Sequence, residues 1–370
     1  MAGKTAQYTV PEYYGRFLCK CGECRHNCCC GWPVNISKEE YLRLKGADCA
    51  QELREKLIGA MNVNPNAPED KYAHLVHNKS GKCVLCREDG LCGLQVELGE
   101  GILPDVCRLY PRNTRRLPEA DECACANSCE AVIEQLIALS GPLRFVKAEL
   151  PGEPMFEIDM TPEQYDECKE AVLIMQNRGL SLPERFFALG ERIFGVTAAE
   201  KTPGDMSGAF KLNHILAAYY AYDSKIVRGL CLEAMRYYEM TDKKYLAPAD
   251  IKKAGEKHRA ANEHFTELFP DWEIFFEQLI VNHMFYNNFP HIGGTAKSER
   301  AFISLCVTYS FLRFVLLACM AKKSDRESAV DVLATLFRLI EHSDFKYRAI
   351  TFFPENQPAA PDFWPQFVHM

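Results

Sequence analysis

The stretch Cys19-Lys-Cys21-Gly-Glu-Cys24-Arg-His-Asn-Cys28-Cys29-Cys30 places six thiols within twelve residues. The crowding continues downstream, since fourteen of the eighteen cysteines lie between Cys19 and Cys129 and make up about 13% of those 111 residues. That share exceeds the level that indicates a cysteine-built scaffold. The remaining thiols are spaced singly, as buried hydrophobic residues usually are: Cys168, Cys231, Cys306 and Cys319. The sequence therefore predicts that the thiol chemistry is local to the N-terminal third.

The beginning of the sequence bears on the redox state of these thiols. Residues 1–14 show neither the apolar region nor the cleavage-site pattern of a secretory signal. We therefore expect a cytoplasmic protein, in which thiols are kept reduced. A dense set of reduced cysteines is typical of metal binding or catalysis rather than of cross-linking.

Composition narrows the class of partner. The chain has 370 residues, of which 48% are hydrophobic and 25% charged, and this balance is ordinary for a globular protein. A formal net charge of −7 argues against a nucleic-acid binder, which would carry a basic field. The most apolar run, residues 301–321, contains Arg313 and is expected to be a core helix rather than a membrane span. We expect a protein or small-molecule partner, with no nucleic acid and no membrane.

The pattern of residues predicts two domains in a mainly α protein. Glycines and prolines punctuate the thiol-rich segment, so we expect an irregular lobe that metal ligation, rather than a hydrophobic core, holds together. The capping box Ser37-x-x-Glu40 predicts a helix within it. An extended piece near residues 156–159 marks the junction. We therefore predict a cysteine-rich metal-binding domain over residues 1–150 and an all-helical domain over residues 151–370.

Helix signals are clear in the second domain. Capping boxes predict helix starts at Thr161, Ser181 and Ser324. Apolar residues recur with helical spacing over 271–288 and over 330–342, which predicts core helices. The aromatic stretch 210–222 is interpreted as packing, with a channel for a substrate lysine as the alternative.

The spacing of the thiols leaves two kinds of metal centre open. Zinc usually takes two regular Cys-x2–4-Cys pairs, whereas these cysteines are unevenly spaced and too many for one zinc site. Iron–sulfur clusters also use four thiolates and accept more varied spacing, so the pattern favours iron while leaving zinc open. A Cys-x3-Cys-x2-Cys motif is absent, as are the common nucleotide-binding loops.

Four arginines follow Cys107, namely Arg108, Arg112, Arg115 and Arg116. Their charge would offset a thiolate-bound cluster or grip a carboxylate in a bidentate manner. Solvated surface arginines are the alternative interpretation.

Several motifs together resemble the opening of the flagellin lysine-N-methylase family. They are Pro11-Glu-Tyr13-Tyr14-x-x-Phe17-x-Cys19, Cys24-x3-Cys28-Cys29-x-Gly31-Trp32, Gly81-Lys-Cys83-x8-Cys92, Cys107-x2-Tyr110-Pro111-Arg112 and Ser128-Cys129. Two later pieces, residues 279–282 and 338–342, look more loosely like the helical region of that family. The N-terminal third is also similar to small zinc- or iron-chelating proteins with a cysteine cluster.

The resemblance implies a function and a set of site residues. It implies transfer of a methyl group from S-adenosylmethionine to lysine side chains of flagellin, with a [4Fe-4S] cluster in the enzyme and zinc as the alternative metal. Tyr110 and Arg112 are the expected cofactor contacts, and no catalytic base is identified. The helical domain over residues 151–370 is expected to form the groove for the protein substrate. The implied metal ligands are Cys19, Cys24, Cys28, Cys29, Cys83, Cys92, Cys107 and Cys129.

Two alternatives stay open. The chain has six further cysteines in this region, which would allow a different ligand set or a second site: Cys21, Cys30, Cys49, Cys86, Cys123 and Cys125. A rival function is a non-enzymatic iron- or zinc-binding or redox module whose helical part docks a partner protein.

Overall fold

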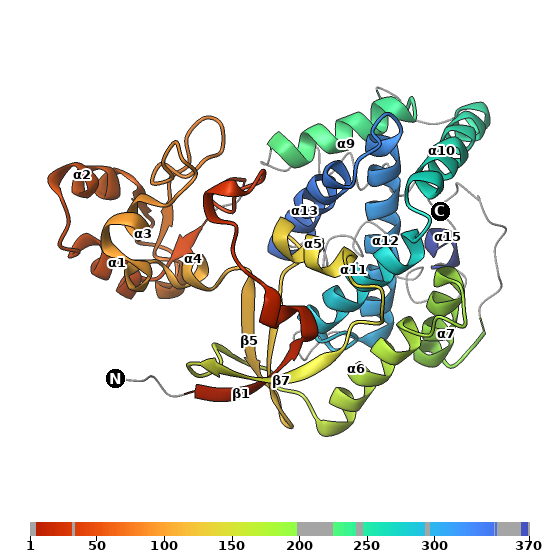
Figure 1. Ribbon diagram of the computed structural model, residues 1–370, viewed down its shortest axis with the longest axis horizontal. Coiled ribbons are helices and arrows are strands. Elements are labelled where there is room, and N and C mark those ends of the chain that lie inside the picture. Colours follow the sequence, from red (N-terminus) through yellow and green to blue (C-terminus); the bar gives the residue numbers. More distant parts are fainter. Residues whose placement is uncertain are drawn as a thin grey trace. The chain divides into compact units, whose positions relative to one another are not determined.

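A computed structural model describes residues 5–31, 34–197, 225–241, 247–292, 297–343, 345 and 364–368 (Figure 1). Trp32 and the aromatic stretch 210–222 lie outside the described residues. The chain divides into two compact units. The thiol-rich unit is Leu18–Pro111, and the helical unit is formed by Met1–Phe17 and almost all of the chain after Pro111.

The thiol-rich unit contains short elements joined by long loops. Its three-stranded sheet has the order β2-β4-β3, and both strand pairs are antiparallel. The strands are β2 (Asn35–Ile36), β3 (Met61–Val63) and β4 (Ala73–Leu75). The α-helices are α1 (Lys38–Lys45), α2 (Gln51–Gly59), α3 (Gly93–Leu98) and α4 (Asp105–Leu109), and single 3-10 turns occur at η2 (Cys21–Glu23), η3 (Glu69–Lys71) and η4 (Glu100–Ile102).

The expectation that metal ligation alone would organise this region is wrong. A small hydrophobic core of its own packs α1 and α2 against the sheet, with Leu44, Leu57 and Leu75 among its buried side chains. These strands have only two or three residues, which is too few to show the alternation of apolar and polar residues that identifies a strand. The sequence therefore did not predict this core. The helix that begins at Ser37 is confirmed, because the side chain of Ser37 accepts a hydrogen bond from the Glu40 amide.

A five-stranded sheet forms one part of the helical unit. Its order is β7-β1-β6-β5-β8. The strands are β1 (Thr5–Pro11), β5 (Arg112–Arg116), β6 (Asp121–Cys125), β7 (Phe145–Pro151) and β8 (Phe156–Glu157). β1 is parallel to β6 and antiparallel to β7, so residues 5–11 pair with strands more than 100 residues away. This pairing is why the units do not follow the domain boundary predicted near residue 150.

Helices make up most of the rest of the helical unit, in agreement with the predicted mainly α class. After the 3-10 turn η1 (Glu12–Arg16), the described helices are α5 (Glu130–Ile137), α6 (Pro162–Met175), α7 (Leu182–Phe194), α9 (Lys225–Tyr237), α10 (Pro248–Leu268), α11 (Trp272–Asn287), α12 (Ser298–Met320), α13 (Arg326–His342) and α15 (Pro365–Val368). Two predicted starts are confirmed, since Thr161 and Ser181 begin helices through capping boxes. The third is displaced by one residue, because Asp325 rather than Ser324 accepts the hydrogen bond from the Ser328 amide.

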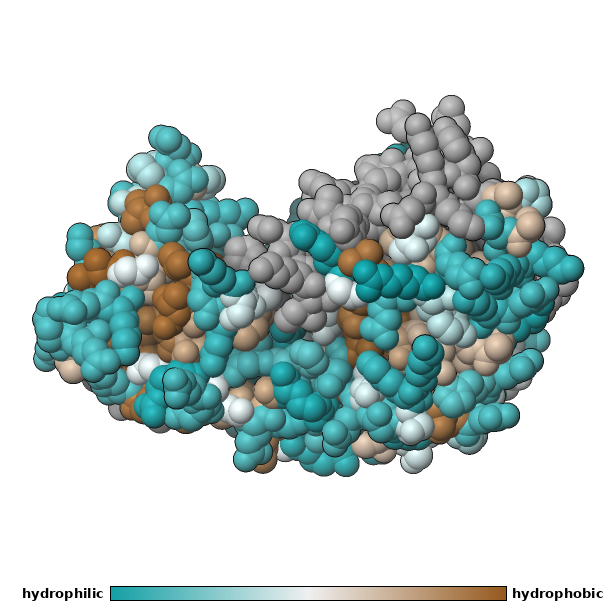
Figure 2. All heavy atoms as spheres, turned by 90° about the horizontal axis from the view of Figure 1, so that it is seen from above, coloured by the Kyte–Doolittle hydropathy of each residue, from teal (hydrophilic) through white to brown (hydrophobic). Residues whose placement is uncertain are grey.

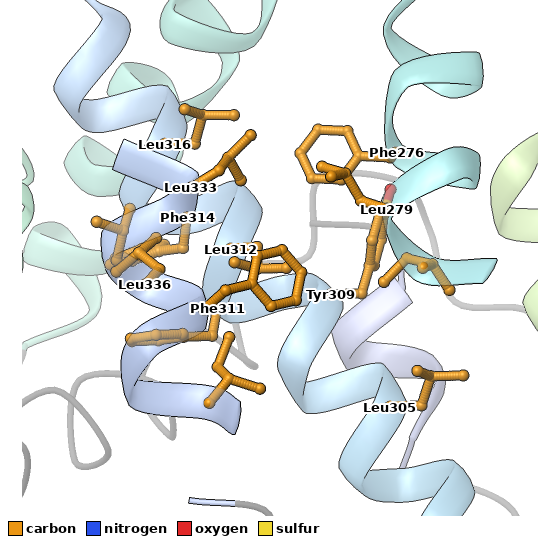
Figure 3. Close-up of a cluster of buried hydrophobic side chains, with 14 of the residues drawn as sticks. Phe276, Leu279, Leu305, Tyr309, Phe311, Leu312, Phe314, Leu316, Leu333 and Leu336 are labelled. Atoms are coloured by element: carbon orange, nitrogen blue, oxygen red, sulfur yellow. The ribbon is translucent and has the colours of Figure 1, made fainter. Parts of the chain in front are cut away.

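The core of the helical unit forms around α12. Figure 3 shows Phe276 and Leu279 of α11, Tyr309 and Leu312 of α12, and side chains of α13 such as Leu333 meeting in one cluster. α12 is long and apolar enough to cross a membrane by composition, yet its most apolar window is wholly buried within the protein. The core helix predicted over residues 301–321 is confirmed.

Candidate functional site

Two loops of the thiol-rich unit carry most of its cysteines, and glycines let these loops touch. A Cβ atom on Gly22 would lie 2.3 Å from the carbonyl oxygen of Asp89. Gly90 has φ of +80°, and a Cβ there would lie 2.9 Å from the Cα of Gly22. The Asn27 side-chain amide donates to the Gly90 carbonyl at 2.7 Å. Only residues without a side chain permit this backbone approach, which links residues 19–30 to residues 83–92.

The same two loops pair through their backbones beside the thiols. The Cys83 amide donates to the Cys29 carbonyl at 2.8 Å, and Cys30 forms an isolated β-bridge with Lys82. Cys86 and Cys92 form a second bridge. Thiols separated by more than fifty residues in the sequence are thereby brought into one region of the unit.

The thiols in these loops influence one another. A hydrogen bond with Cys28, together with burial, raises the pKa of the Cys29 thiol. Burial, together with the neighbouring thiols of Cys92, Cys28 and Cys83, raises the pKa of Cys107 to about 12. Burial likewise raises the pKa values of Cys83 and Cys92. The thiol of Cys29 interacts with those of Cys28, Cys86 and Cys92. The thiol of Cys107 interacts with those of Cys92, Cys28 and Cys83.

The donor chemistry of these loops fits a thiolate-bound group. Neutral, partly buried thiols lose their protons to solvent when they bind a metal. The resulting thiolates are the ligands of iron–sulfur clusters and of structural zinc. Within the described residues, which include every cysteine, the thiols are reduced and no three His, Cys, Asp or Glu side chains are arranged to hold a single metal ion. The ligand set implied by the family resemblance therefore stays a prediction.

The remaining predicted ligands fall in different surroundings. Cys19 belongs to the thiol-rich unit, where burial raises the pKa of its thiol, and Cys24 follows the turn η2. Cys129 belongs to the helical unit and immediately precedes α5. Of the six further cysteines, Cys123 and Cys125 lie in β6 and are fully buried within the helical unit.

The two predicted cofactor contacts lie in different units. Tyr110 ends α4 in the thiol-rich unit. Arg112 begins β5 in the helical unit, and its guanidinium carbon lies 5.1 Å from the ring centroid of Phe17 and 5.9 Å from that of Tyr14. This stacking fixes the guanidinium against two aromatic faces.

One arginine of the cluster after Cys107 is not a solvated surface residue. Arg115 is buried and forms a 2.7 Å ion pair with Glu122, directly opposite it in the β5–β6 pairing. The Tyr165 hydroxyl donates to the other carboxylate oxygen of Glu122 at 2.9 Å. Arg115 also donates to the Tyr286 carbonyl. Sequence reasoning missed Glu122; the only available signal was its position opposite an arginine in a short hairpin.

A cavity of about 350 Å³ adjoins this buried carboxylate. Its lining is mostly apolar and comes from the sheet, α6 and the end of α11, including Phe145, Leu173 and Phe285. Glu122, Tyr165, Cys168 and Lys169 supply the ionisable groups of its wall. A cavity of this size with few polar groups is typical of sites for small organic molecules.

A buried polar network joins the segments that carried the family resemblance within the helical unit. Tyr13 donates to the Asn282 side chain at 2.7 Å, and Asn282 donates to Asn127 at 2.6 Å. The Glu341 carboxylate accepts hydrogen bonds from the backbone amides of Asn127 and Ser128 at 3.2 and 2.9 Å. Such a fully bonded network fixes one packing of α5, α11 and α13.

Comparison with known proteins gives a family. The FliB lysine N-methylase C-terminal domain matches residues 170–357. A lysine-N-methylase of Salmonella typhimurium is 30% identical over 112 residues, which are 30% of this chain and 27% of that protein. The flagellar biosynthetic protein FliU of Salmonella muenchen is 29% identical over 112 residues, 30% of this chain and 64% of that protein.

The matches to these relatives therefore span about a quarter of the first and less than two thirds of the second. No solved structure matches the chain. The domain match, however, covers more than half of the 370 residues. The chain belongs to the FliB lysine N-methylase family.

Proposed function

We propose that this protein is a protein-lysine N-methyltransferase that moves a methyl group from S-adenosylmethionine to lysine side chains of flagellin. The observation that carries the proposal is the match of residues 170–357 to the FliB lysine N-methylase C-terminal domain. The names of the relatives, lysine-N-methylase and flagellar biosynthetic protein, support the choice of flagellin as substrate. We also propose that the reaction takes place in the cytoplasm, where thiols remain reduced.

The reaction sets one physical requirement. A lysine ammonium has a pKa of about 10.4 and must lose its proton before the nitrogen lone pair can attack. The nitrogen then forms the new N–CH3 bond while the S–CH3 bond of the sulfonium breaks and its electrons return to sulfur. S-adenosylhomocysteine leaves as a neutral thioether. The reaction is balanced without an oxidant, a reductant or a radical.

We further propose that the thiol-rich unit holds a [4Fe-4S] cluster, with zinc as the alternative. Four of the thiols of Cys28, Cys29, Cys83, Cys92 and Cys107 would hold it, since backbone hydrogen bonding brings together the two loops that carry the first four. A bound cluster would fix the two loops together. The thiols themselves position those loops, and none of them takes part in the methyl transfer.

The test is an incubation of the anaerobically purified protein with S-adenosylmethionine labelled on its methyl group and with flagellin. We expect label on lysine side chains, located by peptide mass spectrometry. A matched control uses flagellin whose labelled lysines have been changed to arginine, which should take up none. Absence of transfer from a protein with its full metal content would contradict the proposal and leave a metal-binding module that docks a partner.

A further inference from the structure

The cavity beside Glu122 has the size of a site for a small organic molecule, and the function proposed above assigns no ligand to it. Its volume is about 350 Å³. An unbranched lysine side chain would fill only part of that space and would leave the aromatic wall uncovered. A larger, flat molecule matches the volume better, because ligands of this size bury most of their surface in cavities of this range.

We propose that this cavity binds the adenosyl part of the methyl donor, with the nucleoside against the aromatic wall and its ribose hydroxyls at Glu122. The inference rests on the function proposed above and names the donor site within the helical unit. Each feature of the cavity corresponds to one part of the donor.

The aromatic wall suits a flat heteroaromatic base. The rings of Phe145 and Phe285 pack with their centroids 4.4 Å apart and their planes at 35°. The guanidinium carbon of Arg115 lies 5.1 Å from the Phe285 centroid and holds that ring in place. Aromatic and apolar side chains of this kind favour a purine, whose faces are apolar and whose edges can still reach polar groups.

The buried carboxylate of Glu122 suits a donor of hydrogen bonds such as a ribose diol. One of its oxygens accepts from Arg115 at 2.7 Å, and Asn288 lies 3.5 Å from that same oxygen. The other accepts from Tyr165 at 2.9 Å. A carboxylate oxygen has two lone-pair positions, so the oxygen that faces Tyr165 has room for one further donor. Hydrogen bonds to a buried charge are among the stronger ones.

Lys169 supplies a cation to the same wall for the carboxylate of the donor's amino-acid end. Its ammonium forms ion pairs with Asp166 at 2.5 Å and with Glu119 at 3.5 Å. These ion pairs hold the side chain at the surface near the cavity. The side chain is about half exposed and can reorient toward an incoming anion.

Calorimetry with S-adenosylhomocysteine, the unreactive product, tests the site without any need for methyl transfer. The main variant is Leu173→Trp, which places a large side chain at the cavity. Leu173 is 69% exposed, so the substitution leaves the fold intact. Val196→Trp is the matched control, since Val196 is also exposed and does not line the cavity. We expect binding about tenfold weaker or worse for Leu173→Trp and unchanged for Val196→Trp.

A second variant tests whether Lys169 contacts the amino-acid end of the ligand. Lys169→Met should weaken S-adenosylhomocysteine about tenfold but leave 5′-methylthioadenosine, which lacks the amino-acid end, unchanged. If both ligands weakened equally, Lys169 would not contact the carboxylate, and that part of the proposal would be overturned.

The outcomes separate this inference from the proposed function. If the wild-type protein transfers methyl groups and Leu173→Trp binds S-adenosylhomocysteine normally, the cavity is not the donor site although the function stands. If Leu173→Trp weakens only the binding of lysine-containing flagellin peptides, the cavity receives the substrate side chain and the inference is overturned. If the wild-type protein neither binds the nucleoside nor transfers a methyl group, the proposed function fails together with the inference.

Discussion

The two units of this protein are stabilised in different ways. The helical unit has a large hydrophobic core around α12, in which side chains such as Phe276, Tyr309 and Phe337 are fully buried, and two much smaller hydrophobic clusters. Among its described residues, the thiol-rich unit has thirteen buried hydrophobic residues in a separate core and leaves Leu18, Leu42 and Ile58 more than half exposed. Figure 2 shows hydrophobic atoms, drawn in brown, on the surface of that unit.

The difference indicates what each unit needs in order to stay folded. Small domains seldom bury enough apolar surface to be stable alone, and they commonly depend on metals or cross-links. The thiol-rich unit has eleven reduced cysteines and no disulfide. We therefore expect its stability to depend on the bound group, whereas that of the helical unit depends on its core.

The largest expected effect is on metal content. Changing Cys28 and Cys29 together to serine should abolish iron incorporation, because adjacent thiolates would be lost from the centre of the cluster of thiols. The thiol-rich unit should then become sensitive to limited proteolysis while the helical unit resists. Cys49→Ser, in the same unit but outside the implied ligand set, is the control. Full iron content in the double variant, measured by metal and sulfide analysis, would refute the assignment.

The next effect concerns the contact between the two cysteine loops. Gly22→Ala should lower the affinity for iron about tenfold or more, because its Cβ would collide with the Asp89 carbonyl and force the loops apart. Competition with a chelator measures that affinity. Gly101→Ala is a matched control, since a Cβ at Gly101 meets no atom within 4 Å. Equal affinities in the two variants would show that the loop contact does not support the centre.

In the helical unit, removing a buried charge should lower the free energy of unfolding whether or not metal is bound. Glu122→Gln leaves the Arg115 guanidinium buried without a counterion, so we expect the free energy of unfolding to fall by about 3–5 kcal/mol. Tyr165→Phe removes only a hydrogen bond to the same carboxylate and should cost about 1 kcal/mol. Urea denaturation followed by the near-ultraviolet signal of the aromatic core gives both values. A loss below 1 kcal/mol for Glu122→Gln would contradict the account of this pair.

A smaller effect should appear as a pH dependence of the stability of the helical unit. Burial, reinforced by Arg313, lowers the pKa of His258 from 6.5 to about 3. The unfolded chain therefore takes up a proton below pH 6.5 that the folded protein does not, and stability falls as the pH falls. The part due to this residue is about 2 kcal/mol between pH 6.5 and about pH 5.

Substitution of His258 tests that dependence. His258→Asn should flatten the decline in unfolding free energy over this range, measured by denaturation at each pH. The same change at His264, a half-buried histidine of the same helix, is the control. An unchanged slope in His258→Asn would show that another group titrates.

The fold was predictable where the sequence has a strong period or cap. The α11 and α13 stripes and the capping boxes at Ser37, Thr161 and Ser181 identified real helices. The start at Ser324 was wrong by one residue because Asp325 is an equally good cap and lies directly beside it. The sheet escaped prediction because β1 pairs with β6 and β7, and such long-range pairing leaves no local signal.

The candidate site was predictable only in part. The crowding of thiols was visible at once, but which of them bind a metal stays a prediction. That Cys123 and Cys125 are buried in a strand, and that Glu122 adjoins a cavity, depends on the tertiary structure. The stretch Asp121–Cys125 contains two acidic residues followed by three small ones, which does not reveal that both faces of the strand are buried.

The most direct test of the central claim uses S-adenosylmethionine whose methyl group carries three deuterium atoms. The account predicts that the methylated lysine retains all three, because the lysine nitrogen attacks an intact methyl group and the cluster of the thiol-rich unit takes no part in the bond changes. S-adenosylhomocysteine should be the sole nucleoside product. Loss of a deuterium from the transferred group, or formation of 5′-deoxyadenosine, would show radical chemistry at the cluster and contradict the account.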